Sequence, residues 1–405
     1  MPFLNFNPMT DVPVAVDYFS HLIDNETNIP CWYQNYWMQL VAFGEKQETY
    51  SDLMHFSSIL LDYTRERLNT GHWSDVQDCW RKIYAAIRFL TVCKTLNFAE
   101  ECNIDFYISN LGLVDDGLIM GVTIMNNLGQ KLALVLHKII VEKSEQAVLS
   151  DENLFFSEKS HFTLHLPVSS RLKLQRLDSP SLSEFTTMIE EGKPFILTQT
   201  INHWPAVSIW NLNYWKSVAG YRTVPIEIGT SYTECDWSQK LLTINEFISR
   251  FIVEGEKPVG YLAQHQLFLQ IPELEQDIDV PDYCFVKNVE SKVDTNIWFG
   301  PKDTVSPLHH DSEKHNLLCQ VKGFKYVNLF TKSESPYLYA HEEKMLNNTS
   351  KIDLRSVDFN EFPELRNATS FEGIIQPGDV LYIPPFCWHF ITALSCSFSV
   401  NFWWK

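Results

Sequence analysis

The residues best suited to chemistry in this chain are two histidines and one aspartate. His309 and Asp311 are two positions apart, and His389 follows far along the chain, after a hydrophobic run. Side chains two positions apart in a β-strand point to the same face, so His309 and Asp311 can share one interior while His310 points away. Two imidazoles and one carboxylate that occupy one face of an octahedron leave three positions open, which suits redox-active Fe(II). Zinc is the alternative ion, although structural zinc sites are closed and usually include thiolates.

The His-x-Asp pair is weak evidence by itself, because about one such pair is expected by chance in a chain with 13 histidines. The surrounding sequence strengthens the case for a metal site, since Ser306 and Pro307 precede the His-x-Asp pair and a lysine-bearing strand follows the pair. An Fe(II) site of this kind needs a co-substrate that supplies two electrons to dioxygen, and a 2-oxo acid can do so. The far carboxylate of that acid would need a cation inside the protein, which Lys325 could provide. The alternative is that Lys325 is a solvated residue at a strand edge.

The first 150 or so residues have the pattern of helices. Apolar residues recur at intervals of three and four within 51–69 and within 80–90, which is typical of amphipathic helices. Residues 115–143 predict one or two further helices, broken near Asn127–Gly129. No cluster of ionisable groups stands out in this half. We therefore expect a helical adaptor or stabilising domain.

From Arg171 onward, short runs of β-branched and aromatic residues alternate with turn signals such as Gln376–Asp379. The runs cover residues 194–197, 224–228, 324–329, 380–383 and 398–403. Many short strands with irregular returns predict an antiparallel double-sheet barrel of the jelly-roll, cupin-like kind, with helices near 181–191 and 242–251. The expected class is α+β multidomain: an all-α helical domain over 1–150, a linker over 151–170 and a jelly-roll domain over 171–405.

Composition narrows the classes of partner. The 405 residues carry a net charge of −18, which argues against binding to a nucleic-acid backbone and suits a basic peptide or protein. The start of the chain lacks the pattern of a secretory signal, and the apolar runs are shorter than a bilayer span, so we expect a soluble protein without a membrane partner. Nine cysteines without a C-x-x-C pair indicate reduced thiols, as in the cytosol or nucleus. The sequence leaves the oligomeric state open.

The chain from about Arg171 to Lys405 resembles the Jumonji-C family of Fe(II)- and 2-oxoglutarate-dependent oxygenases. The resemblance rests on the stretches Asn202–Pro205, Gly260–Gln266, Trp298–Pro301, Ser306–Asp311, Tyr382–His389 and Phe398–Trp404. It implies a double-stranded β-helix that uses Fe(II), 2-oxoglutarate and dioxygen. The implied catalytic metal ligands are His309, Asp311 and His389, and the implied 2-oxoglutarate contacts are Tyr261, Ser306, Asn316 and Lys325. The segment from Ser312 to Asn316 is one residue longer than the family pattern, so His315 is the alternative to Asn316.

The same resemblance implies substrate contacts at Glu227, Tyr232, Trp237, Gln264 and Trp298. Glu227 could pair with a guanidinium while Tyr232 and Trp298 stack on its plane. We expect a protein hydroxylase that oxidises an arginine carbon and releases succinate and CO2. Its substrate would be an arginine-containing basic protein of the histone, ribosomal or chromatin-associated kind. The resemblance also implies a nuclear location, with the cytoplasm as a further location.

Three other functions stay open at this point. The same scaffold could act as a histone lysine demethylase, since hydroxylation of a methyl-lysine releases formaldehyde. The protein could instead be a non-catalytic reader that binds basic peptides and is stiffened by its metal. A metal-dependent cupin hydrolase or isomerase is the remaining alternative, although such enzymes more often use three histidines or a glutamate-bearing set.

Overall fold

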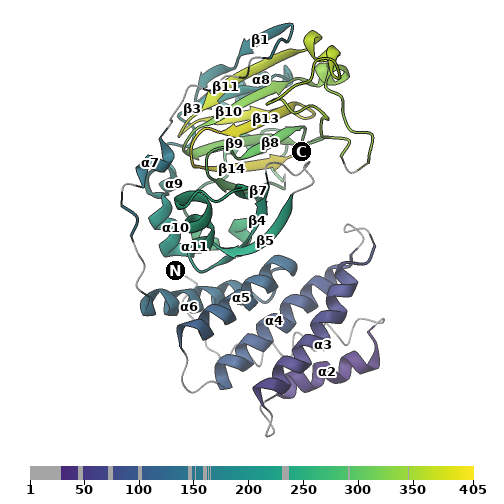
Figure 1. Cartoon of the computed structure of the whole chain (residues 1–405), viewed down its shortest axis with the longest axis vertical. Coiled ribbons are helices and arrows are strands. Elements are labelled where there is room, and N and C mark those ends of the chain that lie inside the picture. The colour runs from purple at the N-terminus through teal and green to yellow at the C-terminus, as the bar shows by residue number, and fades with distance from the viewer. Residues whose placement is uncertain are drawn as a thin grey trace. The chain divides into compact units, whose positions relative to one another are not determined.

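The computed structural model describes residues 29–43, 49–71, 76–98, 103–144, 148–150, 152–157, 162, 164, 166–229, 237–290, 292–344 and 346–405. The chain divides into two compact units. The first, here called the helical unit, comprises Met1–Ala147 together with the short segments Ala219–Val224 and Leu269–Ile271. The second, the barrel unit, comprises Val148–Val218, Pro225–Phe268 and Pro272–Lys405. Figure 1 shows the helical ribbons of the first unit and the strands of the second.

The helical unit contains five long helices among its described residues. They are α2 (Cys31–Ala42), α3 (Tyr50–Leu68), α4 (Asp78–Phe98), α5 (Ile104–Met120) and α6 (Leu128–Lys143). The apolar stripe predicted within 80–90 is buried, from Trp80 through Ile83 and Ile87 to Leu90. The predicted break near Asn127 lies between α5 and α6, where three consecutive residues, 125–127, have positive φ angles and so cannot continue a helix.

A buried ion pair lies inside the helical unit. The guanidinium of Arg222 donates to both carboxylate oxygens of Asp115, with Nη2 2.7 Å from Oδ1. The amide of Gln270 also donates to Asp115 at 2.8 Å, and the backbone N–H of Thr223 donates at 2.7 Å. Both charged side chains are almost fully buried, and the hydrogen bonds compensate for their lost hydration.

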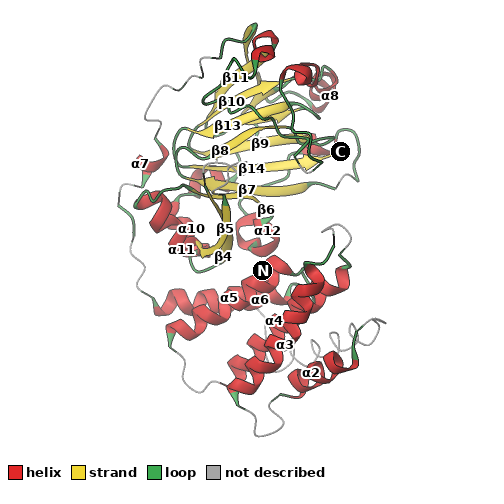
Figure 2. Ribbon diagram, turned by 45° about the vertical axis from the view of Figure 1, so that its right-hand side comes forward, coloured by secondary structure: helices red, strands yellow, loops and turns green. Residues whose placement is uncertain are grey.

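The barrel unit is built from two sheets, shown as yellow arrows in Figure 2. One sheet has the order β1-β11-β10-β13-β8 and the other β2-β3-β12-β9-β14-β7-β6-β4-β5. The strands are β1 (Ser170–Lys173), β2 (Gln175–Asp178), β3 (Phe195–Thr198), β4 (Thr223–Ile228), β5 (Ser238–Thr243), β6 (Gly260–His265), β7 (Asp294–Gly300), β8 (Val305–His309), β9 (His315–Lys322), β10 (Lys325–Phe330), β11 (Thr369–Ile375), β12 (Val380–Ile383), β13 (Trp388–Ala393) and β14 (Ser397–Trp404). Each predicted strand is present within one or two residues, and the predicted fold class is confirmed.

The central strands are buried on both faces, polar residues included. All eight residues of β14 are buried, because this strand lies in the middle of its sheet, between β9 and β7, and both of its faces are covered. Aromatic side chains pack closely there, with the rings of Phe299 and Phe398 stacked 4.0 Å apart. A second apolar cluster draws on β9, β10, β12 and β13, and therefore joins the two sheets.

Short helices accompany the barrel strands. They are α7 (Asn153–Phe156), α8 (Leu182–Glu190), α9 (Pro205–Ile209), α10 (Leu212–Ala219), α11 (Ile244–Phe247), η2 (Ile248–Val253), α12 (Leu267–Gln270), α13 (Pro272–Glu275), η3 (Asp282–Phe285), η4 (Lys332–Tyr337) and η5 (Pro363–Asn367). The helix predicted near 181–191 is α8, which begins with a capping box between Ser181 and Glu184. The helix predicted near 242–251 is α11 continued by η2. Among the described residues, no helix is both long and apolar enough to cross a bilayer.

Candidate metal centre and adjoining cleft

Two neighbouring strands bring the two predicted histidine ligands together. His309, the last residue of β8, is the register partner of His389 on β13, and their ring centroids are 4.2 Å apart. Asp311 lies two residues beyond β8, so the assumption that it belongs to the strand is wrong. Ser312, with a φ of 55°, turns the chain directly after it. One ligand atom from each of the three side chains lies within 4.8 Å of the others.

The hydrogen bonds of the two imidazoles select the tautomer that a metal requires. Nδ1 of His309 lies 2.7 Å from the carbonyl oxygen of Pro307, and Nδ1 of His389 lies 3.1 Å from that of Cys387. A carbonyl oxygen only accepts hydrogen bonds, so each Nδ1 carries a proton, and Nε2 is the ring nitrogen left to bind a metal. Each Nε2 lies 3.7 Å from a carboxylate oxygen of Asp311.

The charge state of this cluster also suits a divalent cation. Burial, reinforced by the neighbouring His389, lowers the pKa of His309 to about 4, so its ring is neutral near pH 7. Burial opposes ionisation of Asp311, but the adjacent histidines and two hydrogen bonds outweigh it and lower the pKa of that carboxyl. Neutral imidazoles beside a carboxylate are the ligand forms that Fe(II) binds. The residues present therefore fit the metal that the sequence predicts.

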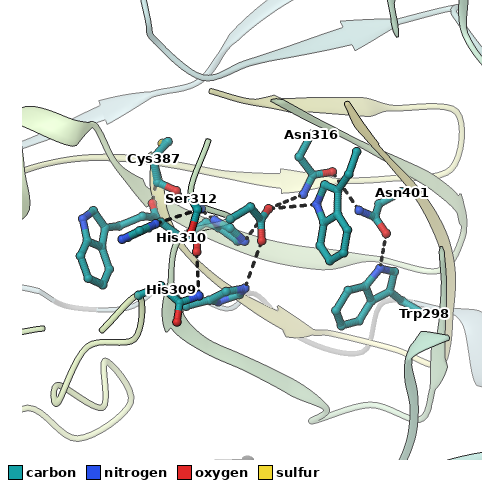
Figure 3. Close-up of polar contacts among 12 residues, drawn as sticks. Trp298, His309, His310, Ser312, Asn316, Cys387 and Asn401 are labelled. Atoms are coloured by element: carbon teal, nitrogen blue, oxygen red, sulfur yellow. Dashed lines mark hydrogen bonds and ion pairs between the residues drawn. The ribbon is translucent and has the colours of Figure 1, made fainter. Parts of the chain in front are cut away.

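Two N–H groups hold one oxygen of the Asp311 carboxylate. Asn316 Nδ2 donates to Oδ2 at 2.8 Å, and the indole Nε1 of Trp403 donates to the same oxygen at 3.1 Å. Figure 3 shows Asn316 and His309 on opposite sides of this group, and His310 turned away from it. The ring of His310 instead packs edge-on against Trp388, with centroids 4.6 Å apart.

Lys325 is a buried cation beside the metal centre. It begins β10, is 2% exposed, and its Nζ lies 3.2 Å from the hydroxyl of Tyr261. No carboxylate of the described residues forms an ion pair with it. Burial lowers the pKa of Lys325 to about 7. The alternative of a solvated lysine at a strand edge is therefore wrong. A buried, unpaired ammonium is costly, so the site suits a carboxylate ligand.

A small inner cavity of about 20 Å³ lies between Lys325 and the predicted metal ligands. It is lined by all four predicted 2-oxoglutarate contacts, Tyr261, Ser306, Asn316 and Lys325, and by the three predicted ligands. This volume holds about one water molecule. A five-carbon dicarboxylate would therefore also have to occupy part of the adjoining cleft, which shares Tyr261 and Ser306 with the inner cavity.

The choice between Asn316 and His315 depends on which face of β9 each occupies. Asn316 lines the inner cavity, whereas Nδ1 of His315 lies 2.8 Å from the hydroxyl of Tyr382 and its ring stacks on Trp404. Adjacent residues of a strand point to opposite faces, so only one of the two can reach the metal centre. The structure places Asn316 there.

The outer cleft, of about 680 Å³, opens beside the metal centre. Three of the predicted substrate contacts line it: Glu227, Gln264 and Trp298. Trp237 lies next to it, since its indole N–H donates to Oε2 of Glu227 at 3.4 Å. Glu227 on β4 is the register partner of Tyr261 on β6, and burial raises the pKa of its carboxyl. Tyr232 lies outside the described residues.

Sequence reasoning missed three residues of the site. Trp403 donates to Asp311, Asn401 donates to Asn316, and Phe386 lines the outer cleft with a φ of 59°. A signal for two of them was available: Asn401 and Trp403 are two positions apart in a predicted strand, and both carry a side-chain N–H group within a mostly apolar run. For Phe386, the sequence offers no comparable signal.

Comparisons with known proteins add independent information. Residues 181–405 match the family model described as "Cupin-like domain". The chain is 39% identical over 361 residues to "Lysine-specific demethylase 8" from Danio rerio, covering 86% of this chain and 87% of that protein. It is 39% identical over 363 residues to "Jumonji C domain-containing protein 5" from Drosophila melanogaster, covering 85% of each chain. It is also 35% identical over 424 residues to "Lysine-specific demethylase 8" from Xenopus tropicalis, covering 93% of this chain and 91% of that protein.

Proposed function

This chain belongs to the Jumonji-C family of cupin-like proteins, and from that premise we propose that it hydroxylates an arginine side chain in a basic protein. One observation carries the proposal. The ligand atoms of His309, Asp311 and His389 lie within 4.8 Å of one another, beside the buried Lys325, which forms no ion pair with a carboxylate of the described residues. When bound, Fe(II) together with 2-oxoglutarate and dioxygen would supply the oxidising chemistry, in which one oxygen atom enters a C–H bond and succinate and CO2 are released.

The protein would hold and orient these reactants. The Nε2 atoms of His309 and His389 and a carboxylate oxygen of Asp311 would ligate the iron. The Lys325 ammonium would pair with the far carboxylate of 2-oxoglutarate. The hydroxyls of Tyr261 and Ser306 and the amide of Asn316 would hydrogen-bond to the same molecule. Since Tyr261, Asn316, Lys325 and His389 are buried, they would also keep water away from the reacting carbon.

The proposal that the substrate is an arginine depends on Glu227. Its partly buried carboxylate lines the outer cleft, where it could pair bidentately with a guanidinium. The indole of Trp298, on the same cleft, could stack on the guanidinium plane, and Trp237 already donates to Glu227. The net charge of −18 would favour a basic substrate. We extend the proposal to histone, ribosomal or chromatin-associated proteins in the nucleus.

Lysine demethylation is the second candidate function. The relatives from Danio rerio and Xenopus tropicalis carry the name "Lysine-specific demethylase 8". The tryptophans of the outer cleft could also surround a methylated ammonium. Glu227 favours arginine over methyl-lysine, because its two carboxylate oxygens match the paired N–H groups of a guanidinium better than the bulk of an ammonium with methyl groups.

Mass spectrometry separates the two candidates. Protein supplied with Fe(II), ascorbate and 2-oxoglutarate would be incubated with histone and ribosomal peptides that contain either arginine or methyl-lysine. Arginyl hydroxylation predicts the gain of one oxygen on arginine and an equal amount of succinate, whereas demethylation predicts the loss of a methyl group. The variants His309→Ala and Lys325→Met should form neither product. Unmodified peptides and no succinate above these variants would refute both candidates and favour the non-catalytic reader.

A further inference from the structure

A chain of hydrogen bonds connects the wall of the outer cleft to the metal-ligating carboxylate. The indole Nε1 of Trp298 donates to Oδ1 of Asn401 at 2.8 Å. Asn401 Nδ2 donates to Oδ1 of Asn316 at 3.2 Å, and Asn316 Nδ2 donates to Oδ2 of Asp311 at 2.8 Å. Figure 3 shows Trp298, Asn401 and Asn316 joined in this order. Each link crosses from one segment of the chain to another, from β7 through β14 and β9 to the turn after β8.

The chemistry of Trp298 and Asp311, at the two ends of this series of hydrogen bonds, allows only one donor-to-acceptor direction along it. An indole N–H can only donate, and an ionised carboxylate can only accept. Between them, each asparagine must accept on its carbonyl side and donate on its amide side. If either amide were rotated by half a turn, two donors or two acceptors would face each other. The orientation of Asn316 is therefore fixed from both ends, by Asp311 directly and by Trp298 through Asn401.

Burial makes that orientation hard to lose. Asn401 is 1% exposed and Asn316 is 5% exposed, so water cannot readily replace a missing partner. Asn401 also lies on the central strand of its sheet, where β9 and β7 fix it from both sides. A side-chain network that is buried and fully paired holds its members in one geometry.

The same series of hydrogen bonds also bears on which oxygen of Asp311 would bind an ion. Asn316 and Trp403 both donate to Oδ2, and among the described residues no hydrogen bond to Oδ1 is formed. Two N–H groups therefore hold Oδ2 in place and leave Oδ1 for the ion. A carboxylate constrained in this way would bind through one oxygen and keep the remaining metal positions open.

We propose that Trp298 and Asn401 are positioning residues for the metal ligand Asp311, and that they act through Asn316. This inference rests on the proposed metal site and adds two residues to it. Trp298 then has a role in the metal centre that is separate from any contact with substrate. Asn401 lines the inner cavity together with the predicted ligands, but among the described residues it forms no hydrogen bond to them.

Metal titration of the full-length protein tests this role without substrate or 2-oxoglutarate. The variants are Trp298→Phe, which keeps an aromatic wall but removes the N–H, and Asn401→Leu, which removes both of its hydrogen bonds. Trp404→Phe is the matched control, since the buried indole N–H of Trp404 has no hydrogen-bond partner among the described residues. Co(II) is the probe, because its visible absorption reports the ligand geometry as well as the affinity.

We expect Asn401→Leu to weaken Co(II) binding about 10- to 100-fold, as the loss of a hydrogen-bonding residue that supports a metal ligand typically does. Trp298→Phe should weaken it by a smaller factor, about 3- to 10-fold, and both variants should shift the visible band. Trp404→Phe should match the wild type in affinity and spectrum. The inference is wrong if Trp298→Phe, folded by circular dichroism, binds Co(II) with the affinity and spectrum of the Trp404→Phe control. Such a result would refute the positioning role even if Asn401→Leu did not fold.

The same titration separates this inference from the proposed function. If the wild type bound Co(II) no better than His309→Ala, the metal site itself would be refuted, and the positioning role with it. If the wild type bound Co(II) and the two variants were indistinguishable from it, only the positioning role would be refuted.

Discussion

Lys325 and Tyr261 meet inside the barrel, where the lysine Nζ lies 3.2 Å from the tyrosine hydroxyl. Both side chains are buried, and burial raises the pKa of Tyr261, so the tyrosine stays neutral and supplies no counter-charge. A neutral hydroxyl compensates only part of the hydration that an ammonium loses. The ligand-free barrel therefore holds a cation that costs stability and that an anionic ligand would relieve.

Removing this charge should stabilise the ligand-free protein. The pKa of Lys325 falls from 10.5 to about 7, so between these pH values the unfolded chain binds a proton that the folded protein does not. The contribution of Lys325 to the free energy of unfolding therefore rises with pH between pH 7 and pH 10.5, by up to about 1.4 kcal/mol per pH unit. It is lowest below pH 7. We expect Lys325→Met to be more stable than the wild type at pH 7, with an advantage that shrinks as the pH increases.

Urea unfolding of both proteins between pH 7 and pH 9 measures this difference. Buried cysteines and tyrosines also titrate in alkaline solution, but they are common to both proteins and cancel in the comparison. A constant difference in the free energy of unfolding across these pH values would show that Lys325 does not titrate within the window.

Two adjacent histidines should differ sharply in metal binding. His309→Ala removes one of three predicted ligands. It should weaken Co(II) or Mn(II) binding by more than the roughly 10- to 100-fold that follows the loss of a residue hydrogen-bonded to a ligand. His310→Ala is the matched control, because the His310 ring packs against Trp388 and faces away from the centre. Isothermal titration of the metal-free protein provides the affinities. Equal losses in the two variants would contradict the predicted ligand set.

Glu227 should control the use of arginine substrates. Glu227→Gln removes the charge but keeps the shape of the side chain, and we expect kcat/KM for an arginine peptide to fall about 10- to 100-fold, the value of a hydrogen bond to a charged group. Because burial raises the pKa of Glu227, the wild type should lose peptide affinity as the pH falls, at a higher pH than an ordinary glutamate would dictate.

The matched control for Glu227 is Glu190→Gln, which removes an exposed carboxylate that does not line the outer cleft. It should leave the pH dependence of peptide affinity unchanged. An unaltered kcat/KM in Glu227→Gln, measured at several pH values, would count against an arginine pocket at this carboxylate.

The helical unit should depend on its buried ion pair. Asp115→Asn leaves the guanidinium of Arg222 buried beside a neutral amide, and we expect it to lower the free energy of unfolding by about 3–5 kcal/mol. Asp116→Asn is the neighbouring control. Asp116 pairs with Arg88 at 2.6 Å, but both side chains retain some solvent exposure, so the cost should be at most about 2 kcal/mol. Chemical unfolding monitored by circular dichroism measures both variants, and equal costs would contradict the role of burial.

Much of the fold and part of the site could be predicted from local patterns. The apolar intervals of residues 80–90 and the alternating runs at 380–383 and 398–403 correspond to α4, β12 and β14, because helix and strand periodicities are properties of short segments. The same local rule placed His309 and Asp311 on one side of the chain, although Asp311 comes from a turn rather than from a strand.

The sequence by itself determined which ligand types are present, how the chain alternates between elements, and that a lysine follows the His-x-Asp pair. Only the tertiary structure decided that Lys325 is buried, that Asn316 rather than His315 reaches the metal centre, and that Asn401 links Trp298 to Asp311. The physical reason is strand register: a shift of one residue between β9 and β14 would turn either Asn316 or Asn401 to the opposite face and break the link between them. Register is set by packing across the whole barrel, and no short stretch of sequence contains it.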